Sequence, residues 1–423
     1  MNIIFNSIPL PTRAPDGEYD CGRGSYMLLW SDSSPDEFER LCGDITASGF
    51  RLFDRTDIEG SIHCTFAGKP VLHAWYCPCE RALRLTADPY TALYNTAPER
   101  CERKYGNTLW QFEVDHSLID CGMCYIVRCC DGSFFVIDSA HMYSVNDDIR
   151  IIEFLRKLNG GAKPTVAGWF FSHGHEDHVA KFSDIVEFHS GEVDIETVYY
   201  NFPSYDHPDN EEWGECGKQV MHRFERELDK HPEIKKVRLH TGQRFFVRDL
   251  EFSVLCTHED IYPNPLSNFN DSSTAIMMTA GGCKVLFPGD CAAESDKVFL
   301  RRYHDALKCS VVQVSHHGHS GTSSEFYRRA GAECVLFPIT EIKFAEEWDK
   351  QEPNRVAVDI AKEYHIASNG TVEIPLPYSF GGTKRLPDET FEDFDGIFAL
   401  WCYEYTDEYK EKLRREFLER SKG

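Results

Sequence analysis

The sequence predicts an α+β protein whose main part is an αββα sandwich, in which two sheets pack face to face with helices on the outside. Two observations favour this fold. From about residue 109 onward, short apolar strands come in runs with helical segments between them, which is typical of two packed sheets covered by helices. The 423 residues also leave room for two or three domains, at roughly 150 residues each.

The first unit is a small α+β domain, which we place at residues 1–105. A capping box from Ser34 to Glu37 begins a helix in this unit. The histidines His63 and His73 are expected to be ordinary, partly buried side chains rather than metal ligands. Strands are predicted at residues 25–30, 61–68 and 71–77.

The second unit, residues 106–380, holds alternating strands and helices. An Asp131-Gly132 turn joins two of its strands as a hairpin. Strands are predicted at residues 110–115, 124–130, 133–138, 165–171, 197–201, 244–256, 274–280, 284–287, 310–315 and 371–376. Helices are predicted at residues 147–158, 181–189, 221–230, 295–304 and 356–364. Residues 381–423 are expected to form an acidic loop and a C-terminal helix over residues 407–419, which packs on or caps the rest.

Charge and hydropathy restrict the function. The chain carries 69 acidic against 45 basic residues, a formal net charge of −24. Nucleic-acid binding draws its affinity from clustered Lys and Arg, so a nucleic-acid partner is disfavoured and a small-molecule substrate is expected. No apolar run approaches the roughly 20 residues that span a membrane, and the N-terminus lacks the features of a signal peptide. We therefore expect a cytoplasmic protein without a membrane partner; a homo-oligomer stays open.

Three histidines and two acidic residues crowd into the six residues from His173 to His178. An apolar strand over residues 165–171 precedes them. Imidazole nitrogen and carboxylate oxygen are ligands that suit zinc and its neighbours in the first transition series. Protonated histidines this close together would destabilise one another, and they would serve no purpose in a core. His173 and His175 are therefore expected to bind one ion, while Asp177 and His178 face another.

Further ligand types follow other predicted strands. Asp290 lies in a Gly-containing turn after a strand, where its two oxygens could bridge two ions. His316 and His317 follow a later strand, and His258 ends the strand FSVLC, which comes after His178 and before Asp290 in the chain. Asp138 ends an earlier strand, where a carboxylate could orient a ligand histidine.

These motifs in this order resemble the metallo-β-lactamase superfamily. The features that carry the resemblance are H-x-H-x-D-H after a strand, an upstream strand ending in Asp, a later strand ending Gly-Asp and a final strand ending in His, spanning residues 109–378. The segment VSHHGHSG at residues 314–321, together with NDSS at residues 270–273, is similar to the hydrolase domain of bacterial DNA-uptake (competence) channel proteins and to phosphorylcholine esterases. The usual glycines after the first motif are replaced by Val179 and Ala180.

The resemblance implies two divalent metal ions, with zinc expected and manganese or iron as alternatives. His173 and His175 would bind the first ion. His258 is assigned as its third ligand, with His207 as the competing candidate because the loop after His258 is longer than the family usually has.

The second ion would be bound by Asp177 and His178 together with one of His316 and His317. The sequence does not choose between these two, and we assign His317 as the ligand. Asp290 would bridge the two ions.

The same resemblance assigns the catalytic and substrate contacts. Asp177 would accept or relay a proton, and His316 would act on the substrate. Asn270 and Ser273 would hold substrate oxygens.

The implied function is a dinuclear metal-dependent hydrolase in which a metal-bridging hydroxide attacks the substrate. A phosphoester on a small molecule is the expected substrate. The alternatives are a nuclease or nucleotide phosphodiesterase, and a hydrolase of a carbonyl substrate such as a lactam, ester or thioester. A redox protein of the same fold is disfavoured, because such proteins usually carry Glu where His175 stands, and a binding module is disfavoured by the apparently complete ligand set.

Overall fold

The computed structural model describes residues 5–387, apart from positions 6, 7, 9, 118, 145, 205–214, 262–265, 267 and 268. The predicted C-terminal helix at residues 407–419 lies outside the described residues, as does His207. The described part forms three sheets and eight α-helices. None of the described helices combines the length and apolarity that crossing a membrane requires.

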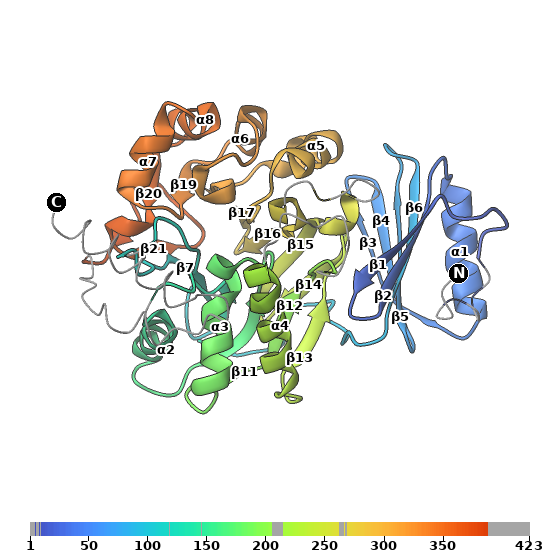
Figure 1. The fold of residues 1–423 in the computed structure, drawn as a ribbon, viewed down its shortest axis with the longest axis horizontal. Coiled ribbons are helices and arrows are strands. Elements are labelled where there is room, and N and C mark those ends of the chain that lie inside the picture. Colours follow the sequence, from blue (N-terminus) through green and yellow to red (C-terminus); the bar gives the residue numbers. More distant parts are fainter. Residues whose placement is uncertain are drawn as a thin grey trace.

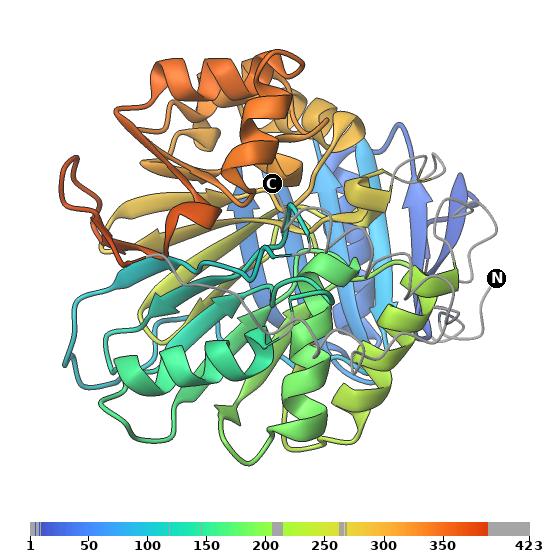
Figure 2. The same ribbon diagram turned by 60° about the vertical axis from the view of Figure 1, so that its left-hand side comes forward.

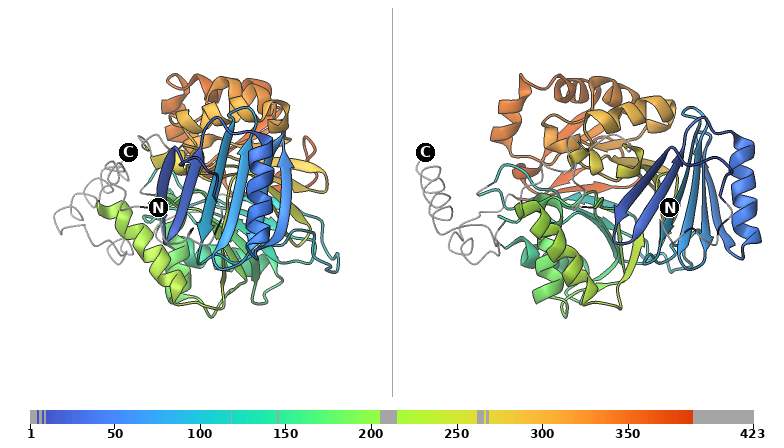
Figure 3. Two further views of the ribbon diagram at one scale, coloured as in Figure 1. Left: turned by 90° about the vertical axis from the view of Figure 1, so that its right-hand side faces the viewer. Right: turned by 45° about the vertical axis from the view of Figure 1, so that its right-hand side comes forward.

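A six-stranded antiparallel sheet forms the N-terminal part, with strand order β1-β2-β6-β5-β4-β3. Helix α1 (Pro35–Ala47) covers its outer face, and the opposite face is turned toward the rest of the chain (Figures 1 and 3). Ser34 and Glu37 form the predicted capping box. The strands are β1 (Gly17–Gly22), β2 (Ser25–Trp30), β3 (Arg51–Ile58), β4 (Ser61–Ala67), β5 (Val71–Cys77) and β6 (Ala82–Asp88).

The main part consists of two further sheets that face each other. One has the order β13-β12-β10-β9-β8-β7-β21-β22 with β11 beside β10, and the other runs from β14 to β20 in chain order. The first contains β7 (Thr108–Gln111), β8 (Tyr125–Arg128), β9 (Phe134–Ile137), β10 (Thr165–Phe170), β11 (Asp194–Ile195), β12 (Thr197–Tyr200), β13 (Lys235–Arg238), β21 (Val372–Pro375) and β22 (Lys384–Arg385). The second contains β14 (Arg244–Val247), β15 (Leu250–Cys256), β16 (Ala275–Ala280), β17 (Cys283–Phe287), β18 (Val311–Gln313), β19 (Cys334–Phe337) and β20 (Glu363–Ile366).

Helices cover both outer faces of this sandwich (Figure 2). Between the sheets, the ring of Phe135 on β9 lies 4.3 Å from that of Phe252 on β15, measured between centroids. The predicted αββα layering is therefore confirmed. The helices beside the first sheet are α2 (Asp147–Leu158), α3 (Glu176–Phe188) and α4 (Glu215–Asp229), and those beside the second are α5 (Ala293–Arg302), α6 (Ser324–Ala330), α7 (Glu341–Trp348) and α8 (Glu352–Ile360).

Helix α3 begins earlier than predicted. It starts at Glu176 rather than near residue 181, so Asp177 and His178 lie in its first turn and not in a loop. The carboxylates of Glu176 and Asp177 suit the positive end of a helix dipole.

At the other end of the chain, the helix predicted at residues 356–364 is α8, which ends at Ile360 and is followed by strand β20.

Parallel pairing brings the polar strand ends to one edge of each sheet. β9 and β10 are parallel neighbours in the first sheet, and β17 and β18 are parallel neighbours in the second. The carboxyl ends of parallel strands meet at the same edge, so the residues that follow these four strands can converge.

Candidate metal centre

Four side chains from the ends of three strands converge at the centre of the sandwich edge. They are Asp177, His178, Asp290 and His317, which each offer one ligand atom within 4.8 Å of the others. His317 Nε2 lies 2.8 Å from Asp177 Oδ2 and 3.2 Å from Asp290 Oδ2. His178 Nε2 lies 3.3 Å from Asp290 Oδ2 and 3.5 Å from Asp177 Oδ2. These are the residues that the resemblance assigned to the second ion and to the bridge.

The two histidines of this group are held from behind. His178 Nδ1 lies 2.8 Å from Asp138 Oδ2, and His317 Nδ1 lies 2.8 Å from the carbonyl oxygen of Pro338. In each ring, Nε2 therefore points toward the two carboxylates. Both Nε2 atoms are buried and have no hydrogen-bond partner, as does Asp290 Oδ1. Buried polar atoms without partners are rare, so this arrangement fits a ligand that fills the space between them.

The ionisation of the group supports the same interpretation. Burial works against the charged forms of Asp290 and Asp177, yet the neighbouring imidazoles outweigh it and hold the pKa of both carboxyls well below the usual range. Burial likewise opposes a charged His317, but Asp290 and Asp177 raise its pKa to about 10. The two ionised carboxylates thus favour a positive charge between them. A divalent cation supplies that charge when the histidines are neutral.

His173 and His175 form a second pair beside this group. His173 Nε2 lies 2.9 Å from His175 Nδ1 and 3.9 Å from Asp290 Oδ2. Burial and the adjacent His178 and His175 rings lower the pKa of His173 well below its usual value, which keeps the ring neutral and able to bind a metal. Among the described residues, no set of three ligand atoms that includes this pair lies within 4.8 Å.

The structure does not bring His258 to this pair. His258 Nε2 lies 3.0 Å from Asn201 Oδ1, and the charged groups that act on its ring are Glu259, Arg238 and His240 rather than the metal-centre carboxylates. The assignment of His258 as third ligand is therefore not supported.

The predicted substrate contacts separate into two kinds. Asn270 Nδ2 lies 3.1 Å from His316 Nε2, so these two side chains are together beside the metal centre. Ser273 is fully buried, and its hydroxyl accepts a hydrogen bond of 3.1 Å from the backbone N–H of Asp290. The hydroxyl of Ser273 therefore contacts the backbone of Asp290, and its contact with substrate stays a prediction.

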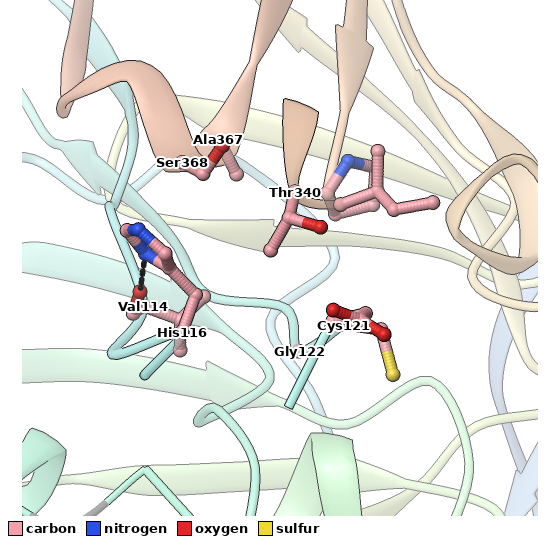
Figure 4. A pocket seen from close by; sticks show the side chains of 10 residues that line it. Val114, His116, Cys121, Gly122, Thr340, Ala367 and Ser368 are labelled. Atoms are coloured by element: carbon pink, nitrogen blue, oxygen red, sulfur yellow. Dashed lines mark hydrogen bonds between the residues drawn. The ribbon is translucent and has the colours of Figure 1, made fainter. Parts of the chain in front are cut away.

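A small pocket lies beside the candidate metal centre, and Figure 4 shows the residues that line it. Two of the residues that line the pocket also contact side chains of the metal centre. Cys121 lines the pocket, and its Sγ lies 3.6 Å from Asp177 Oδ2. Pro338 lines it as well and holds His317. The lining residues are Val114, His116, Asp120, Cys121, Gly122, Pro338, Ile339, Thr340, Ala367 and Ser368.

The contact of Cys121 with Asp177 was not predicted from the sequence. Its only signal was a C-x-x-C spacing with Cys124, and that spacing did not predict a contact with Asp177 on a distant helix. Cys121 also pairs with Ile339 in an isolated β-bridge, which links the two halves of the pocket wall.

Comparison with known proteins gives similarity to solved structures only. No protein-family model and no curated protein matches the chain. The metallo-beta-lactamase fold protein YhfI from Bacillus subtilis is 12% identical, covering 62% of this chain and 97% of that one, with a TM-score of 0.38. Unliganded yeast PDE1 is 11% identical over 64% of this chain and 99% of its own, with a TM-score of 0.39. A diphosphatase from the PhnP family is 14% identical over 55% and 86%, with a TM-score of 0.33.

Proposed function

We propose that the chain is a metal-dependent hydrolase of the metallo-β-lactamase superfamily that binds two divalent ions, with zinc as the expected metal. The observation that carries this proposal is the buried group of Asp177, His178, Asp290 and His317, in which two imidazole nitrogens that form no hydrogen bond lie within ion-pair distance of two carboxylates. His173 and His175 would bind the other ion. Nitrogen and oxygen donors of these types are typical zinc ligands.

When bound, such ions lower the pKa of a water ligand from about 15.7 toward roughly 7, which supplies a nucleophile at neutral pH. The chain's own residues hold the geometry. The Nδ1–H of His178 donates to Asp138, and the Nδ1–H of His317 donates to the Pro338 carbonyl, so that both rings offer Nε2 to an ion. Asp177 is the proposed proton acceptor, and Cys121 donates its thiol proton toward Asp177 Oδ2, which helps to fix that carboxylate.

The pocket supports a small substrate with a single phosphoester. Among the described residues that line it there is no Lys or Arg, so these residues offer no permanently cationic side chain for further phosphates. Asp120 instead places an acidic group in the wall, which suits a neutral or cationic substituent on the phosphoester. Asn270 and His316 lie beside the metal centre and are proposed to contact substrate oxygens. The net charge of −24 is unfavourable for a polynucleotide.

The test combines metal content with turnover. Protein purified without chelator should contain two ions per chain and hydrolyse bis-p-nitrophenyl phosphate or p-nitrophenyl phosphorylcholine, and chelator should abolish that activity. Asp290→Asn should abolish it as well, while the matched variant Asp296→Asn, whose carboxylate accepts a hydrogen bond from Ser323 N on the far side of helix α5, should remain active. Two ions without phosphoester turnover would favour a carbonyl substrate, and a metal-free protein after reconstitution would refute the proposal.

A further inference from the structure

A second group of ligand-type side chains lies where the N-terminal sheet meets the sandwich. It consists of His73 on β5, Asp88 at the end of β6 and His240 between β13 and β14, whose ligand atoms lie within 4.8 Å of one another. All three side chains are buried. The group shares no residue with the metal centre described above.

The geometry directs three donor atoms to one point. His240 Nε2 lies 2.5 Å and His73 Nε2 lies 3.6 Å from Asp88 Oδ2. The two imidazole rings stack with centroids 3.9 Å apart, so their Nε2 atoms reach the carboxylate from the same side.

Both histidines are oriented through their other ring nitrogen. His240 Nδ1 lies 2.8 Å from Glu259 Oε1. His73 Nδ1 lies 3.3 Å from Thr65 Oγ1, 3.3 Å from Gln243 Nε2 and 3.4 Å from His63 Nε2, and a ring that binds an ion through Nε2 would donate its Nδ1 proton to Thr65. Histidines that bind metal almost always give this second nitrogen to a carboxylate, carbonyl or similar acceptor, which fixes the ring and raises its basicity. The contact of His240 with Glu259 is therefore the one expected behind a metal ligand.

Without an ion, the group leaves polar atoms unsatisfied. A protonated His240 would pair with both Asp88 and Glu259, yet His73 Nε2 and Asp88 Oδ1 are buried without a hydrogen-bond partner. A cation bound between the two Nε2 atoms and the Asp88 carboxylate would use both orphaned atoms. It would also balance the negative charges of Asp88 and Glu259 when His240 is neutral.

We propose that His73, Asp88 and His240 bind a divalent ion, zinc by its donor set, which fastens the N-terminal sheet to the sandwich. Two imidazole nitrogens and one carboxylate are a common zinc ligand set, and the second oxygen of Asp88 or a water completes the coordination. This inference departs from the expectation that His73 is an ordinary buried histidine.

The site would connect elements that are distant in the sequence. His73 and Asp88 belong to the N-terminal sheet, whereas His240 follows β13 of the sandwich. The contacts next to the site across this junction are polar. His63 Nδ1 lies 3.0 Å from the carbonyl oxygen of Thr241, and the guanidinium of Arg238 donates a hydrogen bond of 3.0 Å to the carbonyl oxygen of Gly22. An ion held from both sides would add a strong bond to a junction that also contains hydrogen bonds, ion pairs and apolar contacts, such as those of Ile58 and Phe53 with the core of the sandwich.

The experiment removes the first centre and counts the ions that stay. In a His173→Ala/Asp177→Ala/Asp290→Ala/His317→Ala variant of the full chain, which removes ligands of both ions of the first centre, one ion per chain should remain after reconstitution with Zn²⁺. Adding His73→Gln should remove that ion, whereas adding His63→Gln should not. His63 is an equally buried histidine on the neighbouring strand that contacts Thr241, Thr65 and, at 3.4 Å, the Nδ1 of His73, so its loss disturbs the same surroundings without removing a proposed ligand.

Zinc X-ray absorption of the same four-residue variant tests the ligands of the second site without altering them, and it applies even if His73→Gln does not fold. Only nitrogen and oxygen neighbours at about 2.0–2.2 Å are expected, and a sulfur shell at about 2.3 Å would overturn the proposal in favour of Cys77 and Cys79. Loss of all ions in the four-residue variant, or an ion that survives the addition of His73→Gln, would also overturn it. Because the count is made without the first centre, it is independent of whether the chain hydrolyses phosphoesters.

Discussion

The Nδ1 of His178 lies 2.8 Å from the Oδ2 of Asp138, and both side chains are fully buried. Asp138 also accepts two hydrogen bonds of 2.8 Å from Ser172, one from its backbone N–H and one from its hydroxyl. The carboxylate is thereby fixed at the end of β9, and it aims His178 Nε2 at Asp177 and Asp290. In the proposed metal centre, Asp138 would therefore position His178 as a ligand.

Asp138→Asn should weaken binding of one of the two ions by about 10–100-fold, because an amide is a poorer acceptor for the His178 N–H and lowers the basicity of the ring. Chelator competition measures this affinity. Asp296→Asn is the matched control, since its carboxylate bonds Ser323 and does not touch the cluster. Unchanged affinity of both ions in Asp138→Asn would contradict the positioning role, whereas a lower melting temperature alone would not establish it.

The neighbouring histidines His316 and His317 should respond differently to the same change. His317→Ala should lose one ion per chain, because His317 Nε2 lies within 3.2 Å of both cluster carboxylates. His316→Ala should keep both ions and lose turnover, because His316 contacts Asn270 at the edge of the centre. Metal analysis and steady-state kinetics on the two variants separate the roles, with each variant serving as the control of the other. The reverse pattern would exchange the assignments.

Filling the pocket should change substrate choice without changing metal content. Ala367 lines the pocket and is itself buried, so the larger ring of Ala367→Phe would occupy space that a substrate substituent needs. We expect kcat/KM for bulky phosphoesters to fall about 10-fold or more relative to methyl phosphoesters, a size typical of pocket discrimination. Ser368→Ala, at the next position, removes volume and should leave the ratio unchanged. Equal losses for small and bulky substrates would mean that the pocket does not hold the substituent.

The strand ends could be predicted from the sequence, and their arrangement explains which site residues were found. β18 is the direct neighbour of β17, so the residues after both strands, His317 and Asp290, meet. β15 is separated from β17 by β16, which places its end two strand spacings, or about 10 Å, away. The end of β15, which His258 follows, is therefore not adjacent to the end of β17, which Asp290 follows. The order of strands in a sheet is not contained in any local motif.

The second histidine group illustrates the same limit over a longer distance. Its members, His73, Asp88 and His240, come from two different sheets or their connections, and each stands alone in its segment. Alternation along a strand predicts which face a side chain occupies, but not which other sheet lies against that face. The capping box at Ser34 and helix α2 were predicted correctly because their signals are contained within one turn or one helix.

Asp260 is a buried carboxylate that joins two arginines at the junction of the N-terminal sheet and the sandwich. Arg84 Nη1 and Arg302 Nη1 each lie 2.6 Å from Asp260 Oδ1. Burial opposes ionisation of Asp260, but Arg302 and Arg84 outweigh it and hold the pKa of this carboxyl well below its usual range. Ionised Asp260 therefore stabilises the folded state.

Asp260→Asn should lower the free energy of unfolding by about 3–5 kcal/mol at pH 7, because it leaves buried Arg84 without its carboxylate and leaves buried Arg302 with Glu80 alone. Since the pKa is depressed in the folded state, the stabilisation is fully present above the unfolded-state pKa of about 3.9 and is lost as pH falls below it. Urea unfolding should therefore show that Asp260→Asn is less stable than the unaltered protein at pH 7. Its free energy of unfolding should also decrease less than that of the unaltered protein when the pH is lowered. Glu39→Gln, which removes the exposed partner of Arg55, should cost at most about 1 kcal/mol. Equal costs for the two variants would contradict a special role for the Asp260 junction.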